Sequence, residues 1–200
     1  MAERMPRVPG PFAAGALTLV ACAALALYAP APLLADAQQD RRMEPALKLF
    51  RALLSADLEL EKKVVDERRL LIVFFHTDDR RRADELAKLF GKSGATETIR
   101  GLPVIAEASV DPRFAAYEHR VPAGIFVAQP PSGAALRDII QFGVANHVIV
   151  YSPFEGHVEK GVLGGLSVEA QVRPYLNQAT LTASHISLKK IFLDVSKVYR

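Results

Sequence analysis

The sequence is poor in the residues from which cysteine-based sites are built. Its 200 residues include one cysteine and no tryptophan. A single thiol excludes an intramolecular disulfide, and it excludes zinc or iron–sulfur sites that need several cysteines. The net charge is also small, with 25 Lys and Arg against 22 Asp and Glu. So small an excess gives no strong field for nucleic acid, and we expect no nucleic-acid partner.

Disorder is a further class that the composition excludes. Half of the residues are hydrophobic, whereas disordered chains are poor in apolar residues and strongly charged. A length of 200 residues suits one domain and is marginal for two. We therefore expect one folded domain.

Residues 1–37 have the layout of a secretory signal peptide. A basic start and an uncharged apolar run from Phe12 to Tyr28 are followed by small residues at Ala35 and Ala37. Cleavage after them leaves a mature domain of residues 38–200 that has no cysteine. Because a thiol-free chain suits an oxidising compartment, we predict the bacterial periplasm.

Two alternatives for this segment stay open. Leu19-Val20-Ala21-Cys22 is similar to a lipobox, in which the cysteine is lipidated. The residues after Cys22 are still apolar, whereas lipoproteins usually turn polar there, so cleavage near Ala37 is favoured. The other alternative is a retained signal anchor, because an apolar run of about 17 residues lies at the short limit for spanning a bilayer. In either case the N-terminal segment alone is expected to contact a membrane.

Strand and helix signals alternate along the mature chain. Helices are expected over 40–56, with Pro45 in the first turn, and over 134–145, with Ser132 as the cap. An uninterrupted apolar run, typical of a buried strand, is found at 70–75, and further strands are expected at 102–108, 124–128 and 147–151. The charged stretch 58–69 is expected to be a helix extension or an exposed connection. The alternation predicts a single α/β domain with a mixed, mostly parallel sheet flanked by helices.

The last third of the chain follows a different pattern. Alternating apolar residues between Val162 and Leu176 predict an antiparallel hairpin that turns at residues 169–171. Pro174 has no N–H to donate, so its strand is expected to be an edge strand or bulged there. A closing helix capped by Ser187 is expected to face inward with Leu188, Ile191, Phe192, Val195 and Val198.

No arrangement typical of catalysis or of metal binding is visible in the sequence. Gly91-Lys92-Ser93 lacks the first glycine of a phosphate-binding loop, and Gly165-Leu166-Ser167-Val168 lacks the last glycine of a nucleophile elbow. No two of the five histidines have the short spacing of paired metal ligands. We therefore predict a protein without catalytic residues, metal or cofactor. An enzyme whose site is assembled from separate loops is the last-ranked alternative.

One cluster of polar residues lies where open α/β sheets bind ligands. His76, Thr77 and Asp78 follow an expected strand and begin a helix, at the carboxyl edge of the sheet. Pro153 and Phe154 follow another strand and are expected at the same edge. These five residues form the candidate ligand- or partner-binding site. Capping of the helix by Thr77 or Asp78, with a solvated His76, explains the first three residues without a ligand.

An ordered set of residues in the C-terminal third carries a resemblance to a known family. It consists of Val148-Ile-Val-Tyr-Ser152, Phe154, Gly161, Gly164 and Gly165, Val172-Arg-Pro-Tyr-Leu-Asn177, and Ile186 and Leu188 before a terminal helix. This order resembles the YfiR family over most of residues 46–198, although only 148–190 is distinctive. Family members carry cysteines that form disulfides, and the mature chain has none, so thiol-based sensing is not expected here.

The resemblance implies a function as a periplasmic regulator. Such a protein would dock on the periplasmic part of an inner-membrane signalling protein, such as a diguanylate cyclase or a sensor kinase. Homodimers are common among such domains, and the hairpin edge is where we expect one. The alternative is a small-solute-binding periplasmic protein, with a cleft around His76, Asp78 and Phe154.

Some residues of the resemblance also have expected structural roles. Phe154 is expected to anchor the loop after the fourth strand. Gly164 and Gly165 would permit a close backbone approach within the hairpin. Asn177 would bond to backbone groups at the exit from the last strand.

Overall fold

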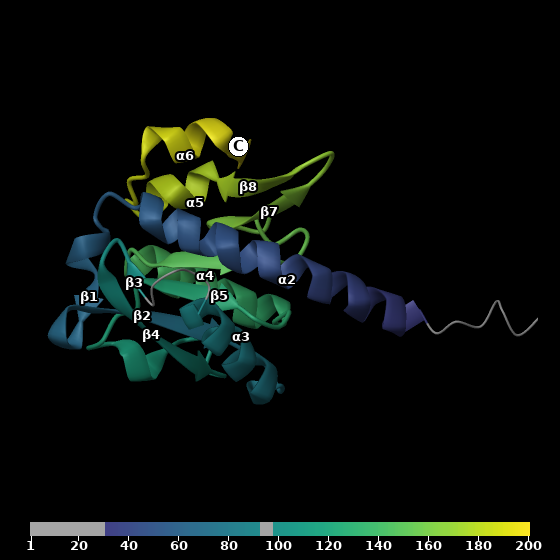
Figure 1. Ribbon diagram of the computed structural model, residues 1–200, viewed down its shortest axis with the longest axis horizontal. Coiled ribbons are helices and arrows are strands. Elements are labelled where there is room, and N and C mark those ends of the chain that lie inside the picture. Colours follow the sequence, from purple (N-terminus) through teal and green to yellow (C-terminus); the bar gives the residue numbers. More distant parts are fainter. Residues whose placement is uncertain (1–30, 93–97) are drawn as a thin grey trace, which may run out of the picture. The chain divides into compact units, whose positions relative to one another are not determined.

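The structure is a computed structural model that describes residues 31–92 and 98–200 (Figure 1). The chain divides into two units, residues 1–38 and 39–200. Most of the predicted signal segment, including Cys22, lies outside the described residues. Among the helices that the structure describes, none is both long and apolar enough to cross a membrane.

A mixed sheet of nine strands lies at the centre of the second unit. Its central strands β4, β2, β5, β6 and β7 are parallel neighbours in that order, and β7 and β8 form an antiparallel hairpin. The sheet order is β3 (Thr98–Ile99), β4 (Leu102–Ser109), β2 (Arg69–Phe75), β5 (Gly124–Val127), β6 (Ile149–Ser152), β7 (Gly164–Val168), β8 (Val172–Asn177) and β9 (Lys197–Tyr199). The short β1 (Val64–Val65) pairs with β2 outside this order. The predicted α/β class with a C-terminal hairpin is confirmed.

Helices pack on both faces of the sheet. Alternate residues of β2 point to opposite faces, so Ile72 and Phe74 belong to one buried cluster and Leu71 and Val73 to the other. The first cluster is covered by α2 (Ala31–Ala56), α3 (Arg80–Lys92), α5 (Gln178–Ala183) and α6 (Lys190–Val195), and the second by α4 (Gly133–Ala145). Burial on both faces explains why the sequence of β2 is continuously apolar.

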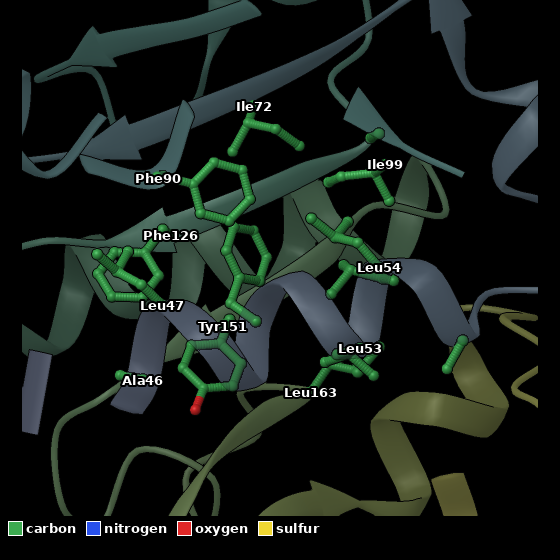
Figure 2. Close-up of a cluster of buried hydrophobic side chains, with 14 of the residues drawn as sticks. Ala46, Leu47, Leu53, Leu54, Ile72, Phe90, Ile99, Phe126, Tyr151 and Leu163 are labelled. Atoms are coloured by element: carbon green, nitrogen blue, oxygen red, sulfur yellow. The ribbon is translucent and has the colours of Figure 1, made fainter. Parts of the chain in front are cut away.

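Aromatic rings fill the cluster beneath α2 (Figure 2). The ring centroid of Phe50 lies 5.4 Å from that of Phe90, 5.6 Å from that of Phe126 and 5.5 Å from that of Tyr151. A Cβ added at Gly124 would lie 2.9 Å from the Phe50 ring. The missing side chain therefore lets α2 pack closely against β5.

Two expectations for the first part of the domain are corrected or narrowed by the structure. The helix expected from Asp40 begins at Ala31, so Pro45 lies inside α2 rather than in its first turn. The stretch 58–69 is not a helix extension; it is a largely exposed connection that contains β1 and two short 3-10 turns. Glu67 and Arg68 have φ values of 50° and 63°, and these left-handed residues turn β1 back onto β2.

The closing helix is shorter than expected and ends in a strand. Ile191 and Val195 of α6 are exposed, and Val198 lies on β9, which pairs in parallel with β8. Ser187 does not cap this helix, because the residue at its N-terminus is Lys189 and no side chain caps it. The helical spacing of the apolar residues therefore led to a wrong prediction, because pairing with β8 extends the last residues.

The hairpin confirms one expectation and corrects another. An added Cβ would lie 2.6 Å from Leu53 at Gly164, and 2.7 Å from Val158 at Gly165, so both glycines permit the predicted close approach. β8 is not an edge strand, because β7 and β9 pair with it on either side. Its pairing with β9 begins at Tyr175, one residue after Pro174, so the proline needs no N–H on that side.

Candidate functional site

The residues predicted to bind a ligand follow β2 and β6, which are not neighbours in the sheet. His76, Thr77 and Asp78 follow β2, and Pro153 and Phe154 follow β6, with β5 between the two strands. All five lie at the carboxyl edge of the parallel strands. Gln129, which follows β5, is hydrogen-bonded to Thr77 of the first group. The sequence analysis did not identify this residue.

Gln129 occupies the position that an anion would take at this edge. Its Oε1 accepts hydrogen bonds from the backbone N–H groups of Thr77 at 2.9 Å, Asp78 at 3.2 Å and Asp79 at 3.0 Å. Its Nε2 donates to Asp78 Oδ1 at 2.9 Å, and this bond is the main reason that the pKa of Asp78 is lowered. Three consecutive backbone donors are therefore already satisfied inside the protein.

The cap of α3 is one residue further along than expected. The N–H of Arg82 donates to Asp79 Oδ1 at 2.8 Å. The helix begins at Arg80, so the capping carboxylate is that of Asp79 and not that of Thr77 or Asp78. His76 is not solvated as the capping explanation assumed, since it is 7% exposed. Within the described residues its Nδ1 has no hydrogen-bond partner.

Pro153 and Phe154 belong to the loop after β6, and Phe154 lines a cavity of about 180 Å³ whose lining does not include His76. Pro153 is buried, and the half-buried Phe154 packs against both core clusters. Ser152 Oγ lies 2.8 Å from His157 Nδ1 and accepts a hydrogen bond from the N–H of Phe154 at 3.2 Å. Because Ser152 is only 1% exposed, this serine–histidine contact holds the loop and offers no accessible nucleophile.

A large cavity lies at the opposite, amino edge of the parallel strands. Its volume is about 600 Å³. Its walls come from β1 and the turns beside it, from the segment before β5, and from the residues before β6. The lining residues are Glu59, Lys62, Lys63, Val64, Val65, Asp66, His119, Arg120, Val121, Pro122, Asn146 and His147. The cavity thus combines an apolar wall with a group of basic side chains.

Arg120 is the most strongly bonded cation of the cavity. Its Nε lies 2.7 Å from Asp66 Oδ2, and its Nη1 lies 2.6 Å from Glu107 Oε1. The bonds to Glu107 and then to Asp66 raise the pKa of Arg120. The bond between Arg120 and Asp66 also lowers the pKa of the Asp66 carboxyl group. Burial and then Glu107 raise the pKa of the Tyr117 hydroxyl to about 12. Both carboxylates are bonded through Nε and Nη1, which leaves Nη2 for a further acceptor.

Lys63 and His147 fix the far wall of the cavity. The ammonium group of Lys63 lies 2.7 Å from the buried carboxylate of Asp57 and donates to the carbonyl oxygen of His147 at 2.6 Å. His147 Nδ1 lies 2.9 Å from the carbonyl oxygen of Ser184. A carbonyl can only accept, so Nδ1 carries the hydrogen of this contact.

Little in the sequence indicates this cavity. His119, Arg120 and His147 are far apart in the chain and belong to no motif. The only signal was the charged stretch 58–69, which was interpreted as a connection. Among the residues that the structure describes, no group of three or more His, Cys, Asp or Glu side chains is arranged to hold a metal ion.

Comparison with known proteins supports the fold. No known family profile matches the chain, and no curated protein matches it. A conserved domain protein from Vibrio cholerae has a TM-score of 0.49 at 14% identity, over 72% of this chain and 58% of that one. An ABC domain from Streptococcus pneumonia, in complex with L-Trp, has a TM-score of 0.50 at 12% identity, over 78% of this chain and 60% of that one. This chain thus spans about three fifths of the length of each structure. At 12% identity, the likeness to the Streptococcus domain shows the α/β fold alone.

Proposed function

We propose that this protein is a non-catalytic binding protein whose ligand is a small organic anion with an apolar body. The observation that carries the proposal is the cavity of about 600 Å³ at the amino edge of the sheet. Its volume lies within the range of small-molecule sites, which combine an apolar lining with a few polar groups.

The lining of the cavity favours an anionic group on the ligand. Val64, Val65 and Val121 supply an apolar wall, and the cations Lys62, Lys63 and Arg120 line the same space beside the carboxylates of Glu59 and Asp66. Two donors of the lining could bind a ligand carboxylate. They are Nη2 of Arg120 and the ammonium group of the exposed Lys62. Lys62 Nζ is held only by the exposed Glu59, at 2.5 Å, and such surface pairs are weak and exchange readily.

The structural neighbour gives limited support to a binding role. The Streptococcus domain is described in complex with L-Trp, a molecule with a carboxylate and an apolar ring. This compound is a reasonable member of a ligand panel for the present chain. The proposal itself rests on the cavity, because the two chains are only 12% identical.

Binding of phenylacetate to the full chain, measured by isothermal titration calorimetry, tests this function. We expect phenylacetate to bind and its neutral amide, phenylacetamide, to bind at least about tenfold more weakly, because a hydrogen bond to a charged group contributes about 1.5–3 kcal/mol. Arg120→Gln should weaken phenylacetate by about tenfold, whereas the matched surface change Arg81→Gln on α3 should leave it unchanged. Equal binding of acid and amide would contradict the proposal.

A second candidate function is regulation of an inner-membrane signalling protein from the periplasm, as the resemblance to the YfiR family implies. The specific observation in its favour is the exposure of apolar side chains on the C-terminal segment, with Ile191 at 74% and Val195 at 56%. In this proposal the signal segment is cleaved and the partner is a diguanylate cyclase or a sensor kinase. Co-purification of such a membrane protein with the full chain tests it.

A further inference from the structure

Exposed apolar side chains are concentrated in the last part of the chain, which forms the β8 and β9 side of the sheet. Five of the eight large hydrophobic residues that are exposed in the described part of the chain fall between residues 168 and 199. Two of them, Val168 and Val172, are register partners next to the hairpin turn. The other three are Ile191, Val195 and Tyr199 on α6 and β9. Exposed apolar side chains that gather in one segment of the chain are candidates for an interaction surface.

Strand β9 ends the sheet on this side. Among the described strands it is the last in the sheet order and pairs with β8 alone, through Tyr175 with Lys197, Leu176 with Val198 and Asn177 with Tyr199. An edge strand presents unpaired backbone N–H and C=O groups to any extended segment that approaches it. The surface formed by β9 and these five exposed apolar residues is called the β9 edge below.

The charge of the β9 edge specifies the kind of segment that fits it. Residues 168–200 contain five Lys and Arg side chains, Arg173, Lys189, Lys190, Lys197 and Arg200, against two acids, Glu169 and Asp194, and Glu159 also lies close enough to Tyr175 and Lys197 to affect their pKa values. Both acids are already engaged, Glu169 by Lys197 at 2.8 Å and Asp194 by Lys190 at 2.9 Å. Two copies of this edge would bring like charges together, whereas an acidic segment would meet complementary charge.

We propose that the β9 edge binds an acidic, extended segment of a partner protein as an added strand of the sheet. Backbone hydrogen bonds to β9 would supply affinity, and alternate side chains of the segment would contact the apolar residues and the basic side chains. This inference is independent of the ligand in the cavity. It gives the second candidate function a docking surface, but its test uses a peptide and therefore succeeds or fails separately from any role in signalling.

The test is fluorescence anisotropy of a labelled peptide of alternating Glu and Val with the full chain. In an added strand, only every second residue of the peptide directs its backbone N–H towards β9. N-methylation of all odd-numbered residues or of all even-numbered residues should therefore have different effects: one set should abolish binding and the other should not. A peptide in which Lys replaces each Glu should bind at least about tenfold more weakly. The proposal would be overturned if both methylated peptides failed to bind, or if both bound as well as the unmethylated peptide.

Charge variants place the peptide on the β9 edge. The double variant Arg173→Glu/Lys189→Glu should weaken the acidic peptide by about fivefold or more, and Lys88→Glu on the distant α3 should change it by less than about twofold. Binding that is insensitive to the double variant would overturn the proposal. The proposal would also be overturned if the chain self-associated and the double variant altered that self-association. Binding to anionic phosphatidylserine vesicles, without binding to the peptide, would overturn it as well.

Discussion

At Gly164 of β7, an added Cβ would lie 2.6 Å from Leu53 Cδ2 of α2 and 3.2 Å from Tyr151 Cδ2 of β6. These contacts leave no space for a methyl group between the hairpin and α2. We therefore predict that Gly164→Ala lowers the free energy of unfolding by about 1–3 kcal/mol, as overpacking does in other cores. Urea denaturation of the variant and the wild type measures the difference.

Gly133 is the matched control for that substitution. It begins α4, and an added Cβ there has no neighbour within 4 Å. Gly133→Ala should be neutral or stabilise the protein by up to about 1 kcal/mol, because alanine restricts the unfolded chain. Equal effects of the two changes would show that α2 and the hairpin do not pack as closely as described.

A second prediction at the residue scale concerns the pH dependence of stability at His157. Burial, and then the charge of Lys160, lower the pKa of this histidine. The unfolded chain takes up a proton near the ordinary histidine pKa of about 6.5, while the folded chain does so only at lower pH. In that interval the unfolded state binds more protons, so stability falls as the pH decreases below about 6.5.

We expect the free energy of unfolding to decrease as the pH falls from about 7 to about 5, in part through this histidine. Urea denaturation at several pH values measures the slope for the wild type and for His157→Gln, in which the slope should be smaller. A variant with the wild-type slope, or an NMR titration that places the His157 pKa above its ordinary value, would contradict the account.

At the scale of secondary structure, the two serines predicted as helix caps have different environments. Ser132 Oγ accepts a hydrogen bond from the N–H of Ala135 at 3.2 Å and caps α4. Ser187 lies before α6, which has no side-chain cap. Ser132→Ala should therefore lower the free energy of unfolding by about 1 kcal/mol, and Ser187→Ala should change it by less than about 0.5 kcal/mol. Thermal or urea denaturation distinguishes the two, and a larger effect at Ser187 would be contrary to the structure.

The elements that sequence reasoning predicted well are those whose local signals agree with their surroundings. β2 is apolar because it is buried on both faces, and α4 has its cap, its apolar stripe and its turn in the right order. The last residues were predicted wrongly because Val198 fits a helical spacing and a strand equally well. Pairing with β8, which brings distant residues together, decides between the two, and a local pattern carries no information about it.

The candidate site was only partly predictable for the same reason. His76, Thr77 and Asp78 were placed correctly at the carboxyl edge, but the bond network of Gln129, 51 residues away from Asp78, could not be inferred from spacing. The cavity at the amino edge is formed by segments around residues 59–66, 119–122 and 146–147. Each segment taken alone has the composition of an ordinary exposed connection.

At the scale of the whole molecule, Asp57 links parts of the chain that are distant in sequence. Its carboxylate lies 2.7 Å from Lys63 Nζ and accepts a hydrogen bond from the N–H of Glu59 at 2.9 Å. Its carbonyl oxygen accepts a hydrogen bond from Arg100 Nη1 at 2.9 Å, and its backbone forms an isolated bridge with Leu188. The residue therefore joins the end of α2 to the cavity wall and to the segment before α6.

We predict that Asp57→Ala lowers the free energy of unfolding by about 3 kcal/mol or more, because it leaves the mostly buried ammonium group of Lys63 without its carboxylate. The control Glu61→Ala removes an exposed carboxylate that lies 2.9 Å from Arg100 and should change stability by less than about 1 kcal/mol. Urea denaturation measures both. Similar values for the two variants would mean that the buried ion pair does not hold these segments together.

The position of the ligand distinguishes the two edges of the sheet most directly. An NMR titration of the isotopically labelled full chain with phenylacetate reports which backbone amides change. The account predicts saturable shifts at Val65, Val121 and His147, which line the cavity. Shifts confined to Thr77 and Asp78 at the carboxyl edge, or no saturable shift at the cavity residues, would contradict it.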